Sequence, residues 1–140
     1  MLLAARQALD NHGGQTLLTG VTVLTSLNRS DLVEIGIDRA PDEQVMVLAS
    51  LAAENGLDGV VCSGQEAGII KDRFGEDFLR VTPGIRPDNY LPVDDQRRTL
   101  TPRQALAQGS SYLVIGRPVT EAANPTDALL AIKKEIGEDG

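Results

Sequence analysis

Two short segments combine glycine and arginine just after an apolar, strand-like run. Residues 81–87 read Val-Thr-Pro-Gly-Ile-Arg-Pro, and Gln96 follows ten residues after Arg86. Residues 112–118 end in Gly116-Arg117-Pro118. A strand that ends in this way sets a backbone N–H beside a guanidinium, and a planar guanidinium can bind two phosphate oxygens at once. The pattern predicts a phosphate site at the ends of two strands.

Four apolar runs predict the strands that carry these segments. They cover residues 16–25, 57–62, 78–83 and 112–116. Helical patterns lie between the runs, for example Pro41 followed by Val45, Leu48, Ala49 and Ala52 at i, i+3, i+4 and i+7 spacing. Strands that are apolar throughout and alternate with helices predict an α/β fold with a parallel sheet.

Two architectures fit that order, a doubly wound open sheet and part of a (β/α)8 barrel. An open sheet usually binds phosphate at a glycine-rich turn after its first strand. The first run here ends in Val23-Leu24-Thr25-Ser26, without a glycine cluster. The candidate phosphate residues follow the last two strands, as in barrels. A barrel needs roughly 250 residues, so we predict that residues 1–140 form one partial barrel domain of four strand–helix units.

Composition narrows the classes of partner. The formal net charge is −7, which disfavours binding to nucleic acid. The single cysteine, Cys62, excludes an internal disulfide and fits a cytoplasmic protein. No apolar run reaches the ~20 residues of a membrane span. His12 is the only histidine, and we predict neither a metal site nor a cofactor.

Other polar residues have simpler structural interpretations. Ser63 with Glu66 three residues later predicts a helix capping box. Cys62 is expected in the core. Arg97 and Arg98 are predicted to be a solvated pair, although the loop could bring one of them near the phosphate.

Five segments in order carry a resemblance to a known family. They are Val21 to Ser26 (VTVLTS), Gly56 to Ser63 (GLDGVVCS), Val81 to Pro87 (VTPGIRP), Asp95 to Arg98 (DQRR) and Val114 to Pro118 (VIGRP). Together they resemble the C-terminal half of the bacterial orotidine 5′-phosphate decarboxylases. The resemblance implies a TIM-barrel lyase of de novo pyrimidine biosynthesis, which converts orotidine 5′-phosphate (OMP) to UMP and CO₂. It also implies a cytoplasmic homodimer.

The resemblance assigns roles to particular residues. It places Thr25 near the pyrimidine and Pro83 in the wall of the pocket beside the base. It places Arg86, Gln96, Gly116 and Arg117 at the substrate phosphate.

The chain also departs from the family. It lacks the Asp-x-Lys-x-x-Asp motif, because none of its lysines, Lys71, Lys133 and Lys134, has the required neighbours. We therefore predict no catalytic residue in this chain, no activity of the chain alone, and a truncated sequence. A non-catalytic phosphate-binding half-barrel or interaction module is the alternative. Sugar-phosphate decarboxylases and isomerases are the competing enzyme class.

Overall fold

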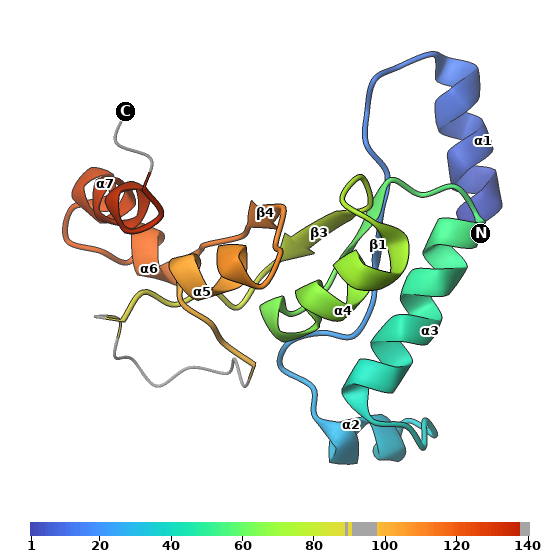
Figure 1. Cartoon of the computed structure of the whole chain (residues 1–140), viewed down its shortest axis with the longest axis horizontal. Coiled ribbons are helices and arrows are strands. Elements are labelled where there is room, and N and C mark those ends of the chain that lie inside the picture. Colours follow the sequence, from blue (N-terminus) through green and yellow to red (C-terminus); the bar gives the residue numbers. More distant parts are fainter. Residues whose placement is uncertain (89, 91–97, 138–140) are drawn as a thin grey trace.

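A computed structural model describes residues 1–88, 90 and 98–137. Gln96 lies outside the described residues. The elements follow one another across the molecule in nearly chain order, from α1 and α3 on one side to α6 and α7 on the other (Figure 1).

The centre of the fold is a four-stranded parallel sheet in the order β1-β2-β3-β4. The strands are β1 (Thr19–Val21), β2 (Gly59–Val61), β3 (Leu79–Thr82) and β4 (Tyr112–Leu113). The predicted fold class, an α/β chain with parallel strands in sequence order, is confirmed. The strands are much shorter than predicted, most of all the first, for which residues 16–25 were expected. A run of apolar residues indicates which residues are buried. A strand, however, extends only over the residues that form hydrogen bonds with a neighbouring strand.

Seven helices are present in the described residues. They are α1 (Leu2–His12), α2 (Arg29–Glu34), α3 (Pro41–Glu54), α4 (Gly64–Phe74), α5 (Pro102–Ala107), α6 (Arg117–Thr120) and α7 (Pro125–Glu135). Proline stands in the first turn of α3, α5 and α7, where its missing N–H costs nothing. None of the helices in this part of the chain is long and apolar enough to cross a membrane.

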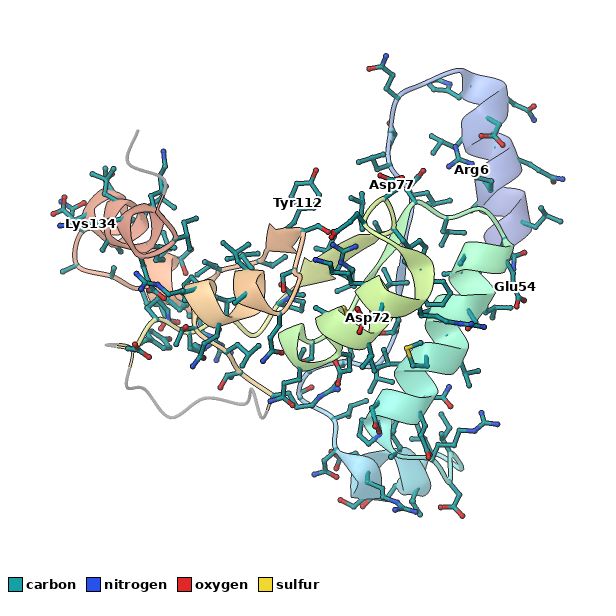
Figure 2. All side chains as sticks on the ribbon, viewed as in Figure 1. Arg6, Glu54, Asp72, Asp77, Tyr112 and Lys134 are labelled. Carbon is teal, nitrogen blue, oxygen red and sulfur yellow. The ribbon has the colours of Figure 1, made fainter. Side chains whose placement is uncertain are left out.

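The two faces of the sheet differ in their cover. Val60, Cys62 and Thr82 lie on the face against which the helices pack, and all three are buried. The opposite face carries Val21, which is 60% exposed, and Tyr112, which is 54% exposed. Tyr112 projects from β4 into the open, away from α5 (Figure 2). Within the described residues, no further strand pairs with the outer edges of β1 and β4.

A buried arginine fixes the amino end of the sheet. Arg80 on β3 is 3% exposed, and its guanidinium donates to the main-chain carbonyls of Gly75, Glu76, Phe78 and Gly109 at 2.6–3.1 Å. These carbonyls lie before β3 and before β4, so one side chain ties together the segments that enter two strands. Arg80 was not among the residues predicted from the sequence to have a role.

Candidate functional site

A pocket of about 230 Å³ opens at the carboxyl end of the sheet, where the predicted base-binding residues meet. Thr25 follows β1 and Pro83 follows β3, and both line it together with Cys62 at the end of β2. Its lining residues are Val21, Val23, Leu24, Thr25, Ser26, Val61, Cys62 and Pro83. The structure therefore brings together two residues that are 58 positions apart in the sequence.

A tight turn presents Thr25 to this pocket. The N–H of Leu27 donates to the carbonyl of Leu24 at 3.0 Å, and Asn28 caps the first turn of α2. Thr25 is 5% exposed, so its side chain is packed within the wall.

The segment after β3 turns sharply at a glycine. Gly84 has a φ of +77°, a conformation that side-chain-bearing residues rarely adopt. Ile85 then forms a parallel bridge with Leu100, and the N–H of Arg86 donates to the carbonyl of Leu100 at 2.9 Å. The turn thus sets Pro83 beside the pocket and sends Arg86 away from the axis of the strand.

The guanidinium of Arg86 is directed towards the α6 side of the molecule. It donates to the carbonyl of Ile85 at 2.9 Å and lies 5.5 Å from the centre of the Tyr90 ring. The Tyr90 hydroxyl in turn lies 3.5 Å from a carboxylate oxygen of Glu121, which ends α6. These contacts place the Arg86 segment beside the helix that Arg117 begins.

Gly116 and Arg117 follow β4 at the same edge of the sheet. The N–H of Val114 donates to the carbonyl of Thr82, so the end of β4 is held against the end of β3. Gly116 caps α6, and its carbonyl accepts from the N–H groups of Val119 and Thr120. Gly116 is exposed and Arg117 is half-buried. The predicted phosphate residues Arg86 and Arg117 therefore follow neighbouring strands at the carboxyl end of the sheet.

Arg98 corrects a sequence-based prediction, because most of its side chain is covered rather than solvated, while Arg97 lies outside the described residues. Its side chain is 11% exposed and donates to Glu66 on α4 and to the carbonyls of Val23 and Leu24. The sequence held one indication. Glu66 stands four residues before the buried Ile70, on the apolar face of its helix, where a carboxylate needs a cationic partner.

Cys62 lies in the core as predicted, and Ser63 caps α4, but its hydroxyl accepts from Gln65 and the predicted partner Glu66 pairs with Arg98 instead. The Ser63 hydroxyl accepts from the N–H of Gln65 at 3.2 Å and caps α4. Burial raises the pKa of the Cys62 thiol to about 12, with a smaller contribution from Glu66. A thiol of that pKa is a poor nucleophile, so Cys62 contributes to the wall and not to chemistry.

The pocket has no proton donor of the kind that carbanion chemistry requires. Lys71 stands near the end of α4 and pairs with the exposed Glu76 at 2.7 Å. Lys133 and Lys134 lie in the last turn of α7, and Lys134 lies on the opposite side of the molecule from Arg6 and Glu54 (Figure 2). No lysine lines the pocket. The described residues contain no group of three His, Cys, Asp or Glu side chains that could hold a metal ion.

Comparisons with known proteins identify the family of the chain. The family model described as "Orotidine 5′-phosphate decarboxylase / HUMPS family" matches residues 1–132. Curated relatives named orotidine 5′-phosphate decarboxylase include one from Neisseria meningitidis serogroup C, 57% identical over 97% of this chain and 54% of its own length. One from Chromohalobacter salexigens is 52% identical over 99% of this chain and 58% of its own length. The chain thus spans about half the length of these relatives.

Solved structures show the same relationship. The crystal structure of orotidine 5′-phosphate decarboxylase from Lactobacillus acidophilus matches 89% of this chain and 50% of its own, with 40% identity and a TM-score of 0.71. An uncharacterized conserved protein from Geobacillus kaustophilus matches 98% of this chain and 58% of its own, with 39% identity and a TM-score of 0.76. Since the family model, the relatives and the solved structures agree, the chain belongs to the orotidine 5′-phosphate decarboxylase family.

Proposed function

We propose that this chain is the substrate-binding half of an orotidine 5′-phosphate decarboxylase. Residues 1–140 would form one partial barrel domain that binds the phosphate and the base of OMP or UMP. The observation that carries the proposal is the pocket between Thr25 and Pro83, at the same sheet edge as the Arg86 and Arg117 segments. A pyrimidine nucleotide has a flat base, which suits a small pocket, and a phosphate, which suits the arginines that follow β3 and β4 at the same end of the sheet.

Each proposed contact has a physical reason. Arg86, Gln96 and Arg117 offer donors to the phosphate oxygens, and Gly116 allows the ligand to approach the backbone closely. Thr25 and Pro83 bound the base. Binding energy from the phosphate, which does not react, can orient the reacting end of the substrate.

The reaction itself requires groups that this chain does not place in the pocket. Decarboxylation breaks the bond between C6 of the pyrimidine and the carboxylate, releases CO₂ and leaves the electron pair on C6. A lysine must then donate a proton to C6, and carboxylates must orient that lysine. No lysine lines the pocket, so we infer that the chain alone is inactive.

A second half-barrel would supply these groups and cover the open face of the sheet. The exposed Val21 and Tyr112 and the unpaired edges of β1 and β4 suit closure by further strands. In such a complete enzyme we expect a cytoplasmic homodimer. The absence of a lysine from the pocket lining is equally compatible with the alternative, a non-catalytic phosphate-binding half-barrel or interaction module.

Reconstitution tests the proposal. The 140-residue chain is assayed for OMP decarboxylation alone and together with the N-terminal portion of the Neisseria meningitidis relative, the part that the match leaves out. We expect UMP binding but no turnover by the chain alone, and turnover by the mixture. Arg117→Ala should abolish the turnover of the mixture. The control Arg29→Ala, which changes an exposed arginine on α2, should not.

The outcomes separate the two functions. UMP binding without turnover by the mixture would favour the non-catalytic module. Turnover by the chain alone would overturn its predicted inactivity, and absence of both UMP binding and turnover would overturn the proposal.

A further inference from the structure

Residues 98–100, which we call the crossing segment, run across the carboxyl ends of three strands. At β3, Leu100 pairs with Ile85 and accepts from the N–H of Arg86. At β2, the carbonyl of Arg98 lies 3.4 Å from the hydroxyl of Ser63. At β1, the guanidinium of Arg98 bonds to the carbonyl of Leu24 at 2.9 Å. The crossing segment therefore joins the two walls of the nucleotide pocket, because Thr25 follows Leu24 and Pro83 precedes Ile85.

The side chain of Arg98 makes this junction by dividing its donors between two elements. Nη1 pairs with Glu66 on α4, while Nη2 reaches the carbonyls of Leu24 and Val23, the latter at 3.3 Å. A planar guanidinium can hold a carboxylate and a carbonyl simultaneously in fixed directions, whereas an ammonium acts as a single point charge.

Glu66 is committed to this pair. Its side chain is 5% exposed, and burial raises the pKa of the carboxyl while Arg98 opposes the rise. Removing one partner of a buried pair leaves the other charge uncompensated. Desolvating two charges costs free energy, so a buried ion pair is weak evidence of a contribution to stability. The contacts of Arg98 with the carbonyls of Val23 and Leu24 are therefore more informative about its role than the pair with Glu66 is.

A glycine lets the crossing segment lie close to α4. A Cβ built on Gly64 would lie 2.8 Å from Cδ1 of Leu100. The close approach holds Leu100 against the first turn of the helix that carries Glu66. The backbone and the Arg98 side chain thus fasten the same segment to α4 independently.

We propose that Arg98, held by Glu66, is a positioning residue that fixes the Thr25 wall of the pocket relative to the Pro83 wall. It acts through the carbonyls of Val23 and Leu24 and does not itself bind the ligand. The ligand part of this inference rests on the proposed function. The mechanical part, that Arg98 restrains residues 24–28, does not.

The test compares Arg98→Lys and Arg98→Ala with Arg103→Ala. Arg103 also donates to a main-chain carbonyl, that of Glu135, but it joins α5 to α7. Arg98→Lys keeps the charge beside Glu66 and lacks the second arm towards Leu24, so it protects the test against failure of the alanine variant to fold. Amide hydrogen exchange of the 140-residue chain gives the mechanical readout. Titrations with UMP and with inorganic phosphate, followed by phosphorus NMR, give the ligand readout.

Arg98→Lys should accelerate exchange at residues 24–28 and leave that of α7 unchanged. It should raise the Kd for UMP about tenfold, since misplaced contacts to the base lose most of their value. The Kd for inorganic phosphate should stay within about twofold, because Arg86 and Arg117 are untouched. A variant that merely unfolds would lose both ligands together. Arg103→Ala should alter neither exchange at residues 24–28 nor the preference for UMP.

Three outcomes would overturn the inference in distinguishable ways. Unchanged exchange at residues 24–28 in both Arg98 variants would refute the restraint. Faster exchange with an unchanged Kd for UMP would refute its role in the pocket. A wild-type chain that binds neither UMP nor phosphate would refute the proposed function and, with it, the ligand role, while the exchange data would still decide the restraint.

Discussion

The two ends of the sheet are both held by buried arginines, but the partners of these arginines differ. At the amino end, Arg80 binds four main-chain carbonyls, all close to β3 or β4. At the carboxyl end, Arg98 joins a carboxylate on α4 to the end of β1. Arg80 satisfies groups that burial would otherwise leave unpaired, which serves stability. Arg98 joins α4 to the segment that carries Thr25, and its proposed role is therefore in the geometry of a site.

The same contrast extends to the neighbouring polar groups. At the amino end, Asp58 accepts from the N–H of Leu18 at 2.6 Å and pairs with Arg6 of α1 at 3.1 Å. These bonds tie the entries of β1 and β2 to a helix. At the carboxyl end, Arg86 and Arg117 are only half-buried, so part of each remains accessible. In α/β barrels the carboxyl end carries function and the amino end stability, and the proposed site of this chain lies at the carboxyl end.

The largest effect on stability is expected at the amino end. Arg80→Met should lower the free energy of unfolding by about 3–5 kcal/mol, because the carbonyls of the buried Phe78 and Gly109 lose their donor. Urea unfolding measures it. Arg80→Lys, which retains one donor group, should lose less. If Arg80→Met unfolds at the same urea concentration as the wild type, the contrast between the two ends fails.

Arg117→Ala should reduce ligand affinity and leave stability nearly unchanged, the opposite of the effect expected for Arg80→Met. Loss of a charge-assisted contact to phosphate should weaken UMP binding by about 2–3 kcal/mol, while the urea midpoint barely changes because the side chain is partly solvated. Titration calorimetry with UMP measures the affinity. A shift in stability without a loss of affinity would assign Arg117 to the fold instead of the site.

Gly84→Ala should modestly lower both the stability of the chain and its affinity for UMP. Its φ of +77° costs a side-chain-bearing residue about 1–2 kcal/mol. The turn sets Pro83 against the pocket, so UMP affinity should fall as well. Gly36→Ala, on a second glycine with positive φ near α2, is the matched control, and it should cost similar stability with no change in affinity.

The smallest effect is a pH dependence at the carboxyl end. Burial raises the pKa of Glu66 above its ordinary value of 4.5, and Arg98 partly offsets the rise. The folded chain therefore holds this proton more tightly than the unfolded chain. Its contribution to stability is present below the unfolded pKa and is lost as the pH rises through the folded pKa.

Comparison with Glu66→Gln isolates that contribution, because glutamine does not titrate. The stability of the wild type relative to Glu66→Gln should fall as the pH is raised from 4 and then level off, as measured by urea unfolding at each pH. A relative stability that instead rises with pH would mean that the pairing with Arg98 outweighs burial.

Local patterns predicted much of this molecule. Apolar runs and helical spacing located the four strands and most helices, since burial and periodicity are written in neighbouring residues. The Gly-Arg segments placed Arg86 and Arg117 after β3 and β4 for the same reason. The four-residue helix α6 was not predicted, because it is too short to show a period.

Other features depended on residues that are distant in sequence. The lengths of the strands depend on pairing with neighbours that sequence alone does not align. The sequence predicted Arg98 to be one of two solvated charges. Only folding brought it into contact with Glu66, which stands 32 residues earlier in the chain. Gln96, predicted at the phosphate, lies outside the described residues and stays a prediction.

The sequence by itself therefore determined which residues are available at the carboxyl ends of the strands, because strand order and motif position are local properties. Only the tertiary structure decided how Thr25 and Pro83 share one pocket and which arginine joins its walls. The reason is that burial of a charge depends on every element packed around it. Arg80 stands within the apolar run of residues 78–83 and Arg98 in a charged stretch, and the fold directs the first to main-chain carbonyls and the second to Glu66 and the end of β1.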